Sequence, residues 1–434
     1  MKESIKVALL GMGNVGIGVW EILDRHYHRI SRCVGAPIEI KKVLVRDIYK
    51  NRKVSVPTDI LTTSFDDIVN DPEIQIVVEL IGGLNPAYEY IKKSIQNKKC
   101  VVTANKAVIS HYGRELMDLA RYNGVELRFE GSVGGGIPII NTLNNSLAAN
   151  EIDAIVGIIN GTTNYILTQM TKWGKDFNTA LKMAQEMGYA EADPSSDVDG
   201  EDAAFKLSIL AFIAFGVQVS PQDIPREGIT RISDKDIQYA AQLGYTIKLL
   251  ATAKKYNGKL DIHVHPALVH NNHPLAAVND EFNALFIKGD AIGEFMMYGK
   301  GAGTLPTGSA VMGDIMDIAA AMPNAFSNRL NRLNGFDETS EKLQINGEGS
   351  GEYYIRLEVA DRPGVLGKIS TVLGNYGVSI ASVVQHGRGE NVVPLILITH
   401  RVERNLLNQA LEEIRKFDVV DEIASILRVE SFSG

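Results

Sequence analysis

Six carboxylates fall within residues 188–206, and this acidic segment of nineteen residues runs directly into an apolar helix. Asp202 and Lys206 lie four residues apart at the start of that helix, so both side chains project from one face. The residues after Lys206 read LSILAFIAF and are apolar on every side, which predicts a buried helix. Because an ion pair is costly to carry into a core, the pair indicates a catalytic site. The alternative is an exposed helix pair that contributes about 0.3–0.5 kcal/mol.

A glycine-rich loop near the amino terminus is the second feature with chemical meaning. It follows an apolar strand and opens a helix, the context in which the pattern GxGxxG predicts a dinucleotide site. The first glycine permits a tight turn, the second lets backbone amides approach a pyrophosphate, and the third allows close packing of helix on strand. The amino terminus of the helix adds partial positive charge. The loop consists of Gly11, Met12, Gly13, Asn14, Val15 and Gly16.

The end of the second predicted strand bears on which dinucleotide is bound. Arg46 suits a 2′-phosphate, whereas Asp47 suits a free 2′-hydroxyl. Arg52 and Lys53 follow closely and add positive charge. These residues favour NADP, with NAD tolerated. The alternative is that Arg46 is only a surface charge at a strand end.

A dinucleotide and a buried lysine together predict hydride transfer. An alcohol gives its hydride to the nicotinamide and its hydroxyl proton to a base, which works best when its pKa is near the ambient pH. A lysine reaches that range when it is desolvated or lies near another cation. Lys206 is the expected base. Lys106 follows a strand whose carboxyl end should point at the nicotinamide crevice, so it is the expected second cation.

Two clusters raise the question of a metal. The acidic segment suits calcium or magnesium, but the EF-hand spacing is absent and one cationic substrate group explains the charge equally well. Histidines gather at His263, His265, His270 and His273. The first two alternate with apolar residues and share one strand face. Zinc is conceivable, but no Cys or Glu lies at a matching spacing, and a polar strand face is the favoured interpretation.

Length and composition set the class of protein. The chain has 434 residues, too many for one core, so two to four domains are expected. The hydrophobic content of 45% and charged content of 22% are typical of globular proteins. A net charge of −8 without a basic stripe argues against nucleic-acid binding.

Cys33 and Cys100 suit neither a disulfide framework nor a zinc site. We find no signal peptide and no run long enough to span a membrane, so we expect a soluble, cytoplasmic protein.

The pattern of elements predicts an α/β protein with three domains. Residues 1–150 alternate continuous apolar strands with amphipathic helices, which predicts a Rossmann-type, doubly wound parallel sheet. We expect strands at residues 5–11, 38–47, 74–82, 99–103 and 126–130, and helices at 15–29, 86–97 and 112–123. Residues 151–335 predict an α+β catalytic and dimerisation domain with an open sheet, in which residues 305–335 fold back onto the first domain. Its strands are expected at 151–160, 259–269 and 282–290, and its last helix at 308–322.

The carboxyl-terminal part predicts a separate small domain. Residues 336–350 are polar and contain Gly and Ser, which favours a linker. Residues 351–434 give the order β-α-β-β-α-β of a ferredoxin-like fold. The expected strands are at 353–361, 379–387, 392–400 and 423–429, and the expected helices are at 364–377 and 403–417.

Four motifs together resemble the monofunctional bacterial homoserine dehydrogenases, over essentially the whole chain. They are the loop GMGNVG, the segment TANKA around Lys106, the segment INGTTNYIL at 159–167, and the acidic signature. The signature is carried by Ala184, Gly188, Tyr189, Glu191, Ala192, Asp193, Pro194, Asp197, Gly200, Asp202 and Lys206.

The resemblance implies reversible, NAD(P)-dependent interconversion of L-homoserine and L-aspartate 4-semialdehyde, on the route to threonine, isoleucine and methionine. It implies Lys206 as general acid/base and Asp202 as the residue that orients it or the substrate hydroxyl. Glu191 would accept the substrate ammonium group, with Asp197 also in the substrate site. Lys106 would lie at the junction of substrate and cofactor. Thr103 would also contact the cofactor, and so would Gly303, which lies in a segment at 301–309 that would return over the nicotinamide.

The resemblance also implies a cation and an effector. The family binds a monovalent cation, usually sodium, mainly through backbone oxygens, and the matching positions are Glu130, Val133, Gly135 and Ile137. The last domain resembles the ACT regulatory module, whose marker here is the turn at residues 361–366, DRPGVL. Such modules pair side by side and bind amino acids, so threonine feedback and a homodimer or homotetramer are expected.

Two other functions are consistent with parts of the sequence. An aspartate-semialdehyde dehydrogenase shares the dinucleotide domain and a substrate, but it needs an activated cysteine. Cys100 should begin a buried strand and Cys33 should lie in a loop, and neither position indicates activation. A non-catalytic amino-acid sensor could combine the same domains, and the acid and lysine constellation argues against it.

Overall fold

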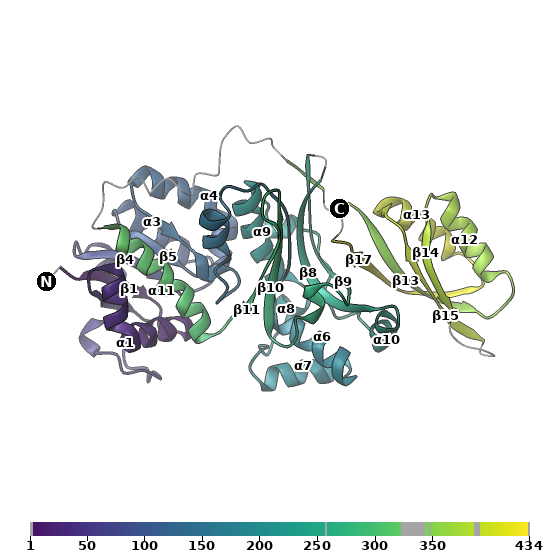
Figure 1. The fold of residues 1–434 in the computed structure, drawn as a ribbon. Helices are drawn as coiled ribbons and strands as arrows, with labels where there is room; N and C mark the ends of the chain where they lie inside the picture. Colours follow the sequence, from purple (N-terminus) through teal and green to yellow (C-terminus); the bar gives the residue numbers. More distant parts are fainter. Residues whose placement is uncertain (1–2, 257, 323–342, 347–348, 386–390, 433–434) are drawn as a thin grey trace. The chain divides into compact units, whose positions relative to one another are not determined.

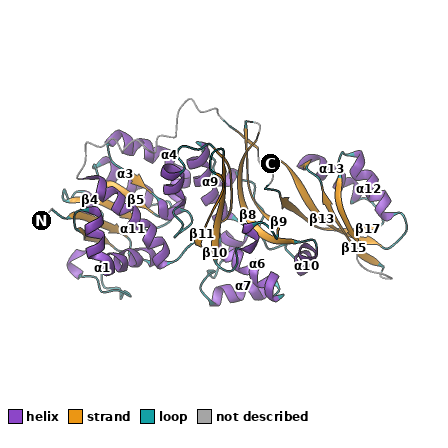
Figure 2. Cartoon of the chain, in the orientation of Figure 1, coloured by secondary structure: helices purple, strands orange, loops and turns teal. Residues whose placement is uncertain are grey.

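The computed structural model describes residues 3–256, 258–322, 343–346, 349–385 and 391–432. The chain folds into two compact units (Figure 1). The first comprises Met1–Asp153, Phe205–Asp223 and Asn283–Lys342, and the second comprises Ala154–Ala204, Ile224–Phe282 and Leu343–Gly434. Helices and strands alternate along most of the chain (Figure 2). The fold class is therefore mixed α/β, as predicted.

A parallel sheet forms the centre of the first unit. Within the described residues its strand order is β3-β2-β1-β4-β5-β6, and all neighbours are parallel. The central strands read IKVALL and IQIVVE and are almost wholly buried, because they are covered on both faces. The predicted doubly wound sheet is confirmed. Its strands are β1 (Ile5–Leu10), β2 (Ile38–Leu44), β3 (Leu61–Thr62), β4 (Ile74–Glu79), β5 (Cys100–Thr103) and β6 (Leu127–Arg128).

Helix α11 (Thr304–Ala321), far along the chain, packs against α1 (Asn14–Val34) in the core of this unit (Figure 1). Its buried apolar residues join those of α1 and of the sheet in one cluster. Close packing depends on a glycine, since a Cβ at Gly18 would lie 2.0 Å from the Thr304 carbonyl oxygen. The helix begins four residues before its predicted start. Residues 323–335 of the predicted fold-back segment lie outside the described residues.

The other elements of the first unit are helices and two further strands. Helix α4 (Lys106–Asn123) begins six residues before the predicted position, because the Asn105 side chain accepts the Val108 N–H at 3.1 Å and caps it. Two more strands, β10 (Phe282–Gly289) and β11 (Gly293–Lys300), pair with each other. The remaining helices are α2 (Asp66–Val69), α3 (Ala87–Gln96) and α5 (Ile139–Asn141), and most of α9 (Glu201–Phe215) also belongs to this unit.

The second unit contains the strands β7 (Ile152–Ile158), β8 (Tyr245–Tyr256) and β9 (Lys259–His270), in that order and antiparallel. Strands β7 and β9 lie where the sequence predicts strands, whereas β8 was not predicted. Strand β8 is buried along most of its length and pairs with β9 over twelve residues. The helices are α6 (Gly161–Trp173), α7 (Phe177–Glu186), α8 (Ser195–Val198) and α10 (Asp234–Gln242).

The carboxyl-terminal part of the second unit has the predicted ferredoxin-like order. Its strands lie in the order β17-β13-β15-β14, all antiparallel, and two helices pack against them. The last residues of β17 also pair with β9, in parallel, so the two sheets of this unit are continuous. The elements are β13 (Ser350–Ala360), α12 (Val365–Asn375), β14 (Ile380–Gln385), β15 (Val392–Thr399), β16 (Val402–Glu403), α13 (Arg404–Ile414) and β17 (Val420–Glu430).

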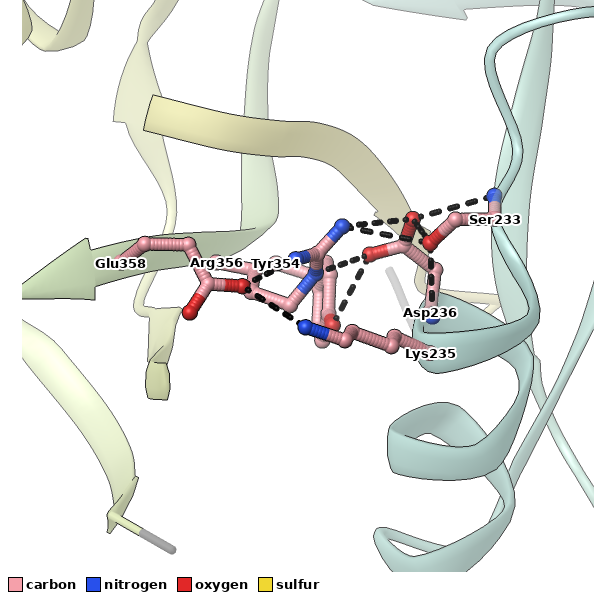
Figure 3. A network of polar contacts seen from close by, with 6 residues as sticks. All are labelled: Ser233, Lys235, Asp236, Tyr354, Arg356 and Glu358. Carbon is pink, nitrogen blue, oxygen red and sulfur yellow. Dashed lines mark hydrogen bonds and ion pairs between the residues drawn. The ribbon is translucent and has the colours of Figure 1, made fainter. Parts of the chain in front are cut away.

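A buried polar network fixes β13 to α10 (Figure 3). Arg356 donates to the Asp236 carboxylate through Nε at 2.8 Å and through Nη2 at 3.3 Å. The Tyr354 hydroxyl donates to the same carboxylate, Ser233 Oγ also accepts from Arg356 Nη2, and Glu358 accepts from Arg356 Nη1. Removal of one partner from such a buried pair costs about 3–5 kcal/mol. The network therefore holds the ferredoxin-like sheet rigidly to this helix.

The predicted linker at 336–350 is only partly described, and one described piece is structured. Residues Gln344–Asn346 form β12, which pairs in parallel with Lys259–Asp261 of β9. Residues 336–342 and 347–348 lie outside the described residues. Among the helices that the structure describes, none is long and apolar enough to cross a membrane.

A buried lysine lies in the middle of β8. Lys248 is 1% exposed, and its Nζ donates to the Val278 carbonyl and to Asn164 Oδ1 at 3.2 Å. Burial lowers the pKa of Lys248 to about 8, from an ordinary value of 10.5. The unfolded chain therefore binds this proton more tightly than the folded chain does.

This difference predicts how stability depends on pH. As the pH rises from 8 to 10.5, the free energy of unfolding of the natural chain should increase, whereas that of Lys248→Met has no such contribution. The difference between the two chains should change by as much as about 3 kcal/mol. Urea unfolding of both chains at pH 7.5 and pH 10 measures this change. Lys182→Met, on the exposed side of α7, is the control and should show no such trend. An equal difference between the natural chain and Lys248→Met at both pH values would contradict the prediction.

Candidate active site

A pocket of about 750 Å³ lies at the carboxyl ends of β1 and β2 in the first unit. Gly11, Met12, Gly13 and Asn14 line it, whereas Val15 and Gly16 lie just behind, in the first turn of α1. Gly11 has φ of 110°, and a Cβ at Gly16 would lie 2.6 Å from the Gly11 carbonyl oxygen. The first turn of α1 carries no acidic residue. Its amides can therefore bind a pyrophosphate.

Basic residues surround the end of this pocket at the carboxyl end of β2. Arg46, Lys50, Arg52 and Lys53 line it together with Asp47. Asp47 Oδ1 accepts the Tyr49 N–H at 2.8 Å, so one carboxylate oxygen is already used within its own loop. Arg52 is fixed by bonds to the backbone carbonyls of this loop. The local charge is positive, which suits a phosphate on the ribose.

A buried carboxyl group, which the sequence analysis did not single out, holds the loop after β4 in place beside the cofactor pocket. Glu79, the last residue of β4, is fully buried. Its Oε1 accepts the N–H groups of Ile81 at 2.7 Å and Gly82 at 3.3 Å, and its Oε2 accepts from Thr103 Oγ1 at 2.6 Å. Burial raises the pKa of Glu79, while these hydrogen bonds act in the opposite direction. In the sequence, the one sign of this role is that Glu79 is a carboxylate at the end of an apolar strand.

The same network reaches the start of α4. Thr103 Oγ1 also accepts the Asn105 N–H at 3.0 Å, and Asn105 Nδ2 donates to the Gly83 carbonyl at 2.7 Å. Asn105 caps the helix whose first residue is Lys106. Glu79 therefore fixes both the loop after β4 and the residue before Lys106. Thr103, predicted as a cofactor contact, is buried and takes part in this network.

The first unit also brings the helices of the two predicted lysines together. The His111 ring of α4 and the Phe205 ring of α9 have centroids 5.7 Å apart. Phe212, two turns further along α9, lies 3.8 Å from the Cβ position of Gly113. Lys206 is half-buried on α9, which is otherwise nearly all buried in this stretch, and the predicted buried helix is confirmed.

In the second unit the acidic segment is joined by an asparagine that was not assigned a role from the sequence. Asn160 Nδ2 donates to Asp197 Oδ1 at 2.6 Å and to Asp202 Oδ2 at 2.8 Å. Its Oδ1 accepts the Thr163 N–H at 2.9 Å and caps α6. Asp202 is buried, in the first turn of α9 and one turn before Lys206. The signal was present in the segment INGTTNYIL, where an Asn precedes a helix.

The rest of the acidic segment forms a surface loop. Thr162 Oγ1 donates to the Tyr189 carbonyl at 2.7 Å and ties the loop to α6. Asp193 accepts from the Ser195 N–H and hydroxyl, so it acts as a loop cap. Glu191 is exposed, and Asp197 is half-buried. The acidic segment therefore presents one exposed and one half-buried carboxylate, and a cationic ligand group can approach the exposed one.

The turn predicted to hold a cation lies in the first unit. The Glu130 carboxylate accepts the N–H groups of Ile140 at 2.8 Å and Asn141 at 2.6 Å, so the side chain caps α5. Burial raises the pKa of Glu130 to about 7. The neighbouring Asp314 accepts the Glu130 N–H at 2.8 Å, and burial raises its pKa well above the ordinary value. The backbone carbonyls of the turn, not this carboxylate, are the available donors.

The turn fits a small monovalent cation in its donor chemistry and its packing. Val133, Gly135 and Ile137 offer backbone carbonyl oxygens, which are hard donors. A Cβ at Gly135 would lie 2.4 Å from the Gly301 carbonyl oxygen, so this turn is closed by the segment before α11. Near Gly301, the buried Asn283 amide has no hydrogen-bond partner within the described part of the chain. Gly303, with φ of 129°, caps α11 in the same segment.

The chain matches family models along most of its length. Residues 11–130 match "Homoserine dehydrogenase, NAD binding domain", residues 138–316 match "Homoserine dehydrogenase", and residues 353–419 match "ACT domain". A homoserine dehydrogenase of Synechocystis sp. is 46% identical over 99% of this chain and 100% of its own length. That of Bacillus subtilis is 40% identical over 99% of both chains.

Solved structures agree with these sequence relationships. A homoserine dehydrogenase from Thiobacillus denitrificans has a TM-score of 0.92 and 39% identity, over 99% of each chain. A hyperthermophilic archaeal homoserine dehydrogenase in complex with NADPH has a TM-score of 0.62 and 27% identity, over 73% of this chain and 97% of that one. With this agreement in sequence, domain order and fold, the chain belongs to the homoserine dehydrogenase family and carries an ACT domain at its carboxyl-terminal end.

Proposed function

We propose that this chain oxidises L-homoserine to L-aspartate 4-semialdehyde and catalyses the reverse reduction, with Lys206 as the proton relay. The observation that carries the proposal is the buried Asp202, held by Asn160 one helical turn before Lys206. This carboxylate is fixed before substrate arrives, which is the property that a positioned acid/base site requires. The reaction belongs to the synthesis of threonine, isoleucine and methionine in the cytoplasm.

The proposed reaction needs a hydride acceptor, a proton acceptor and groups that position the substrate. A bound dinucleotide supplies the hydride acceptor. The hydroxyl proton of the alcohol passes to Lys206, and in the reverse direction Lys206 returns it to the aldehyde oxygen. Asp202 orients Lys206 or the substrate hydroxyl. Glu191 and Asp197 bind the substrate ammonium group, and Lys106 adds a second positive charge near the reacting atoms.

Initial rates with L-homoserine and either NADP or NAD test the proposal directly. We expect absorbance at 340 nm to rise only when homoserine is present. No homoserine-dependent reduction with either dinucleotide would instead favour a non-catalytic amino-acid sensor. Thiol alkylation tests the cysteine-dependent alternative and should leave activity intact, because burial raises the pKa of the Cys100 thiol. Cys33 lies in helix α1 and not in the loop expected from the sequence.

The basic end of the cofactor pocket supports a preference for NADP. The archaeal relative was solved with NADPH, and Arg46 lies at the pocket rim in this chain. A charge-assisted hydrogen bond contributes about 1.5–3 kcal/mol, so Arg46→Ala should lower kcat/KM for NADP roughly 10- to 100-fold and that for NAD far less. The control is Arg25→Ala, an exposed residue of α1. An equal loss with both dinucleotides would contradict the assignment of Arg46 to the 2′-phosphate.

We also propose that the turn with Glu130, Val133, Gly135 and Ile137 binds a monovalent cation, and sodium is the ion to test. The orphaned amide of Asn283 and the carbonyl donors of the turn support this assignment. Sodium binding to the purified chain, followed by isothermal titration calorimetry in a potassium-free and sodium-free buffer, is the test. Absence of any heat with sodium or potassium would remove the assignment.

The ACT domain supports amino-acid feedback, and threonine is the proposed effector. A pocket of about 330 Å³ follows β13 and includes Asp361, Arg362 and Gly364, which caps α12 with φ of 88°. Asp361→Ala should raise the threonine concentration for half-inhibition at least about tenfold, because a charged hydrogen bond to the effector is lost, and should leave kcat unchanged. Glu412→Ala, exposed on α13, is the control. We propose that these domains pair in a homodimer or homotetramer.

The inhibition curve of Asp361→Ala decides this assignment. If the curve coincides with that of the natural chain, threonine does not act through this pocket. A change of single residues is preferable to deletion of the domain. Deletion would remove Arg356 and leave the buried Asp236 carboxylate without its ion-pair partner.

A further inference from the structure

A second, small polar pocket lies in the second unit, and none of its lining residues is assigned to the proposed reaction or effector sites. Its volume is about 60 Å³, and it lies where β17 pairs with β9, between β8 and β13. We call it the junction pocket. It is lined by Thr252, Lys254, Asp261, His263, Ser350, Gly351, Glu352, Arg401, Arg428, Val429, Glu430 and Ser431.

Two lining residues have buried polar atoms that no described residue satisfies. Thr252 is 1% exposed, and its Oγ1 has no hydrogen-bond partner in the described chain. The same holds for Asp261 Oδ1. The backbone closes directly over the other carboxylate oxygen, since a Cβ at Gly349 would lie 2.6 Å from Asp261 Oδ2. An unpaired buried polar group costs about 1–3 kcal/mol, so a pocket that keeps two of them indicates a polar occupant.

The charges of the junction pocket are balanced. Three cationic side chains and three anionic side chains line it. Lys254 and Glu430 form an ion pair with each other, and Lys254 also donates to the Ser431 carbonyl at 3.1 Å. Arg428 Nη1 lies 4.0 Å from Asp261 Oδ2, and Arg401 and Glu352 complete the set, so the lining holds as many positive as negative side chains. A ligand with a single charge would upset this balance, whereas a ligand with one positive and one negative group would preserve it.

The histidines predicted to share a strand face add no charge to the pocket. Arg428 Nη1 lies 3.2 Å from His263 Nε2, and because an arginine can only donate, this imidazole nitrogen accepts. His263 Nδ1 then carries the proton and donates to His265 Nδ1 at 2.8 Å. Both imidazoles are neutral in this arrangement, and burial lowers the pKa of each. Within the described residues no cluster of three or more His, Cys, Asp or Glu side chains could hold zinc.

The size of the junction pocket limits the ligand. A water molecule requires roughly 10–15 Å³ of such space, so the pocket holds roughly four to six groups of that size. That matches the heavy atoms of a very small amino acid. The effector pocket of the ACT domain begins beyond the opposite end of β13, which at 3.3 Å per residue lies about 30 Å away. The two pockets are therefore separate sites.

We propose that the junction pocket binds a small zwitterionic α-amino acid such as glycine or alanine. Its carboxylate would bind Arg428 and Arg401, its ammonium group would bind Asp261 Oδ1, and Thr252 would complete the hydrogen bonds. Because the pocket is built from β8 and β9 on one side and from β13 and β17 on the other, the ligand would join the two sheets of this unit. This site is independent of the threonine assignment above.

Isothermal titration calorimetry of the full chain with glycine tests the proposal, with acetate and methylammonium as single-charge controls. We expect glycine to bind and both controls to bind at least about tenfold more weakly. Asp261→Asn and Thr252→Val keep the side-chain shapes and should each weaken glycine binding about tenfold, the value of one lost hydrogen bond to a charged or buried group. Asp361→Ala, in the ACT effector pocket, should leave glycine binding unchanged.

Three results would overturn the proposal. The first is no binding of glycine or alanine, which would mean that the junction pocket holds only water. The second is binding that neither Asp261→Asn nor Thr252→Val changes, which would place the ligand elsewhere. The third is binding of acetate or methylammonium as tight as that of glycine. Thermal unfolding of both variants without ligand shows whether they remain folded during the titrations.

Discussion

Lys206→Met should lower kcat by roughly 10²- to 10⁴-fold, the range that a general acid/base contributes. The expected reason is that methionine has nearly the same length but cannot accept the hydroxyl proton. The dissociation constant for the dinucleotide should change little, because the glycine-rich pocket is built by other elements. Steady-state rates with homoserine and fluorescence titration with reduced dinucleotide measure the two effects separately.

The control for this change is Lys175→Met, which replaces an exposed lysine. It should leave both kcat and dinucleotide affinity as they are in the natural chain. A Lys206→Met chain that keeps most of its kcat would remove the assigned role. Asp202→Asn should also lower kcat more than cofactor affinity, since it acts through the same proton transfer.

Glu79→Leu should destabilise the first unit by about 3 kcal/mol or more and abolish tight dinucleotide binding. Leucine would leave the amides of Ile81 and Gly82 and the Thr103 hydroxyl without their acceptor, at about 1–3 kcal/mol each. Ile81 also lines the cofactor pocket. The effect should therefore appear both in thermal unfolding and in the dissociation constant for NADP.

A matched series separates hydrogen bonding from charge at this position. Glu79→Gln keeps one carbonyl acceptor for the backbone amides and should retain most of the stability that Glu79→Leu loses. Glu89→Leu removes an exposed carboxylate from α3 and should change neither property. If Glu79→Leu unfolds at the temperature of the natural chain and binds NADP equally well, the organising role assigned to Glu79 is wrong.

The fold was predictable where the pattern was strong. The central strands β1 and β4 of the parallel sheet are continuous apolar runs and lie where predicted, whereas the two-residue β3 was not predicted. Strand β8 was missed because its sequence, YTIKLLATAKKY, has no alternation and contains Lys248. That lysine is tolerated only because a distant carbonyl and Asn164 accept from it, which no local pattern reveals.

In the candidate site, too, local features could be predicted from the sequence and contacts between distant residues could not. The glycine-rich loop is a local feature, so its position and use could be read from adjacent residues. Glu79 and Asn160 act across 24 and 42 residues, on Thr103 and Asp202, and only the folded chain brings these pairs together. Cation binding by backbone carbonyls has no side-chain signature at all, and only the family resemblance pointed to it.

The most direct test of the central claim is amine rescue of Lys206→Ala, measured as hydride transfer in a single turnover at 340 nm. If Lys206 relays the proton, small primary amines should restore the rate in proportion to their concentration, with the rate depending on amine pKa. The Lys175→Ala chain should show no dependence on amine. Hydride transfer in Lys206→Ala that is as fast as in the natural chain, or that no amine accelerates, would contradict the account.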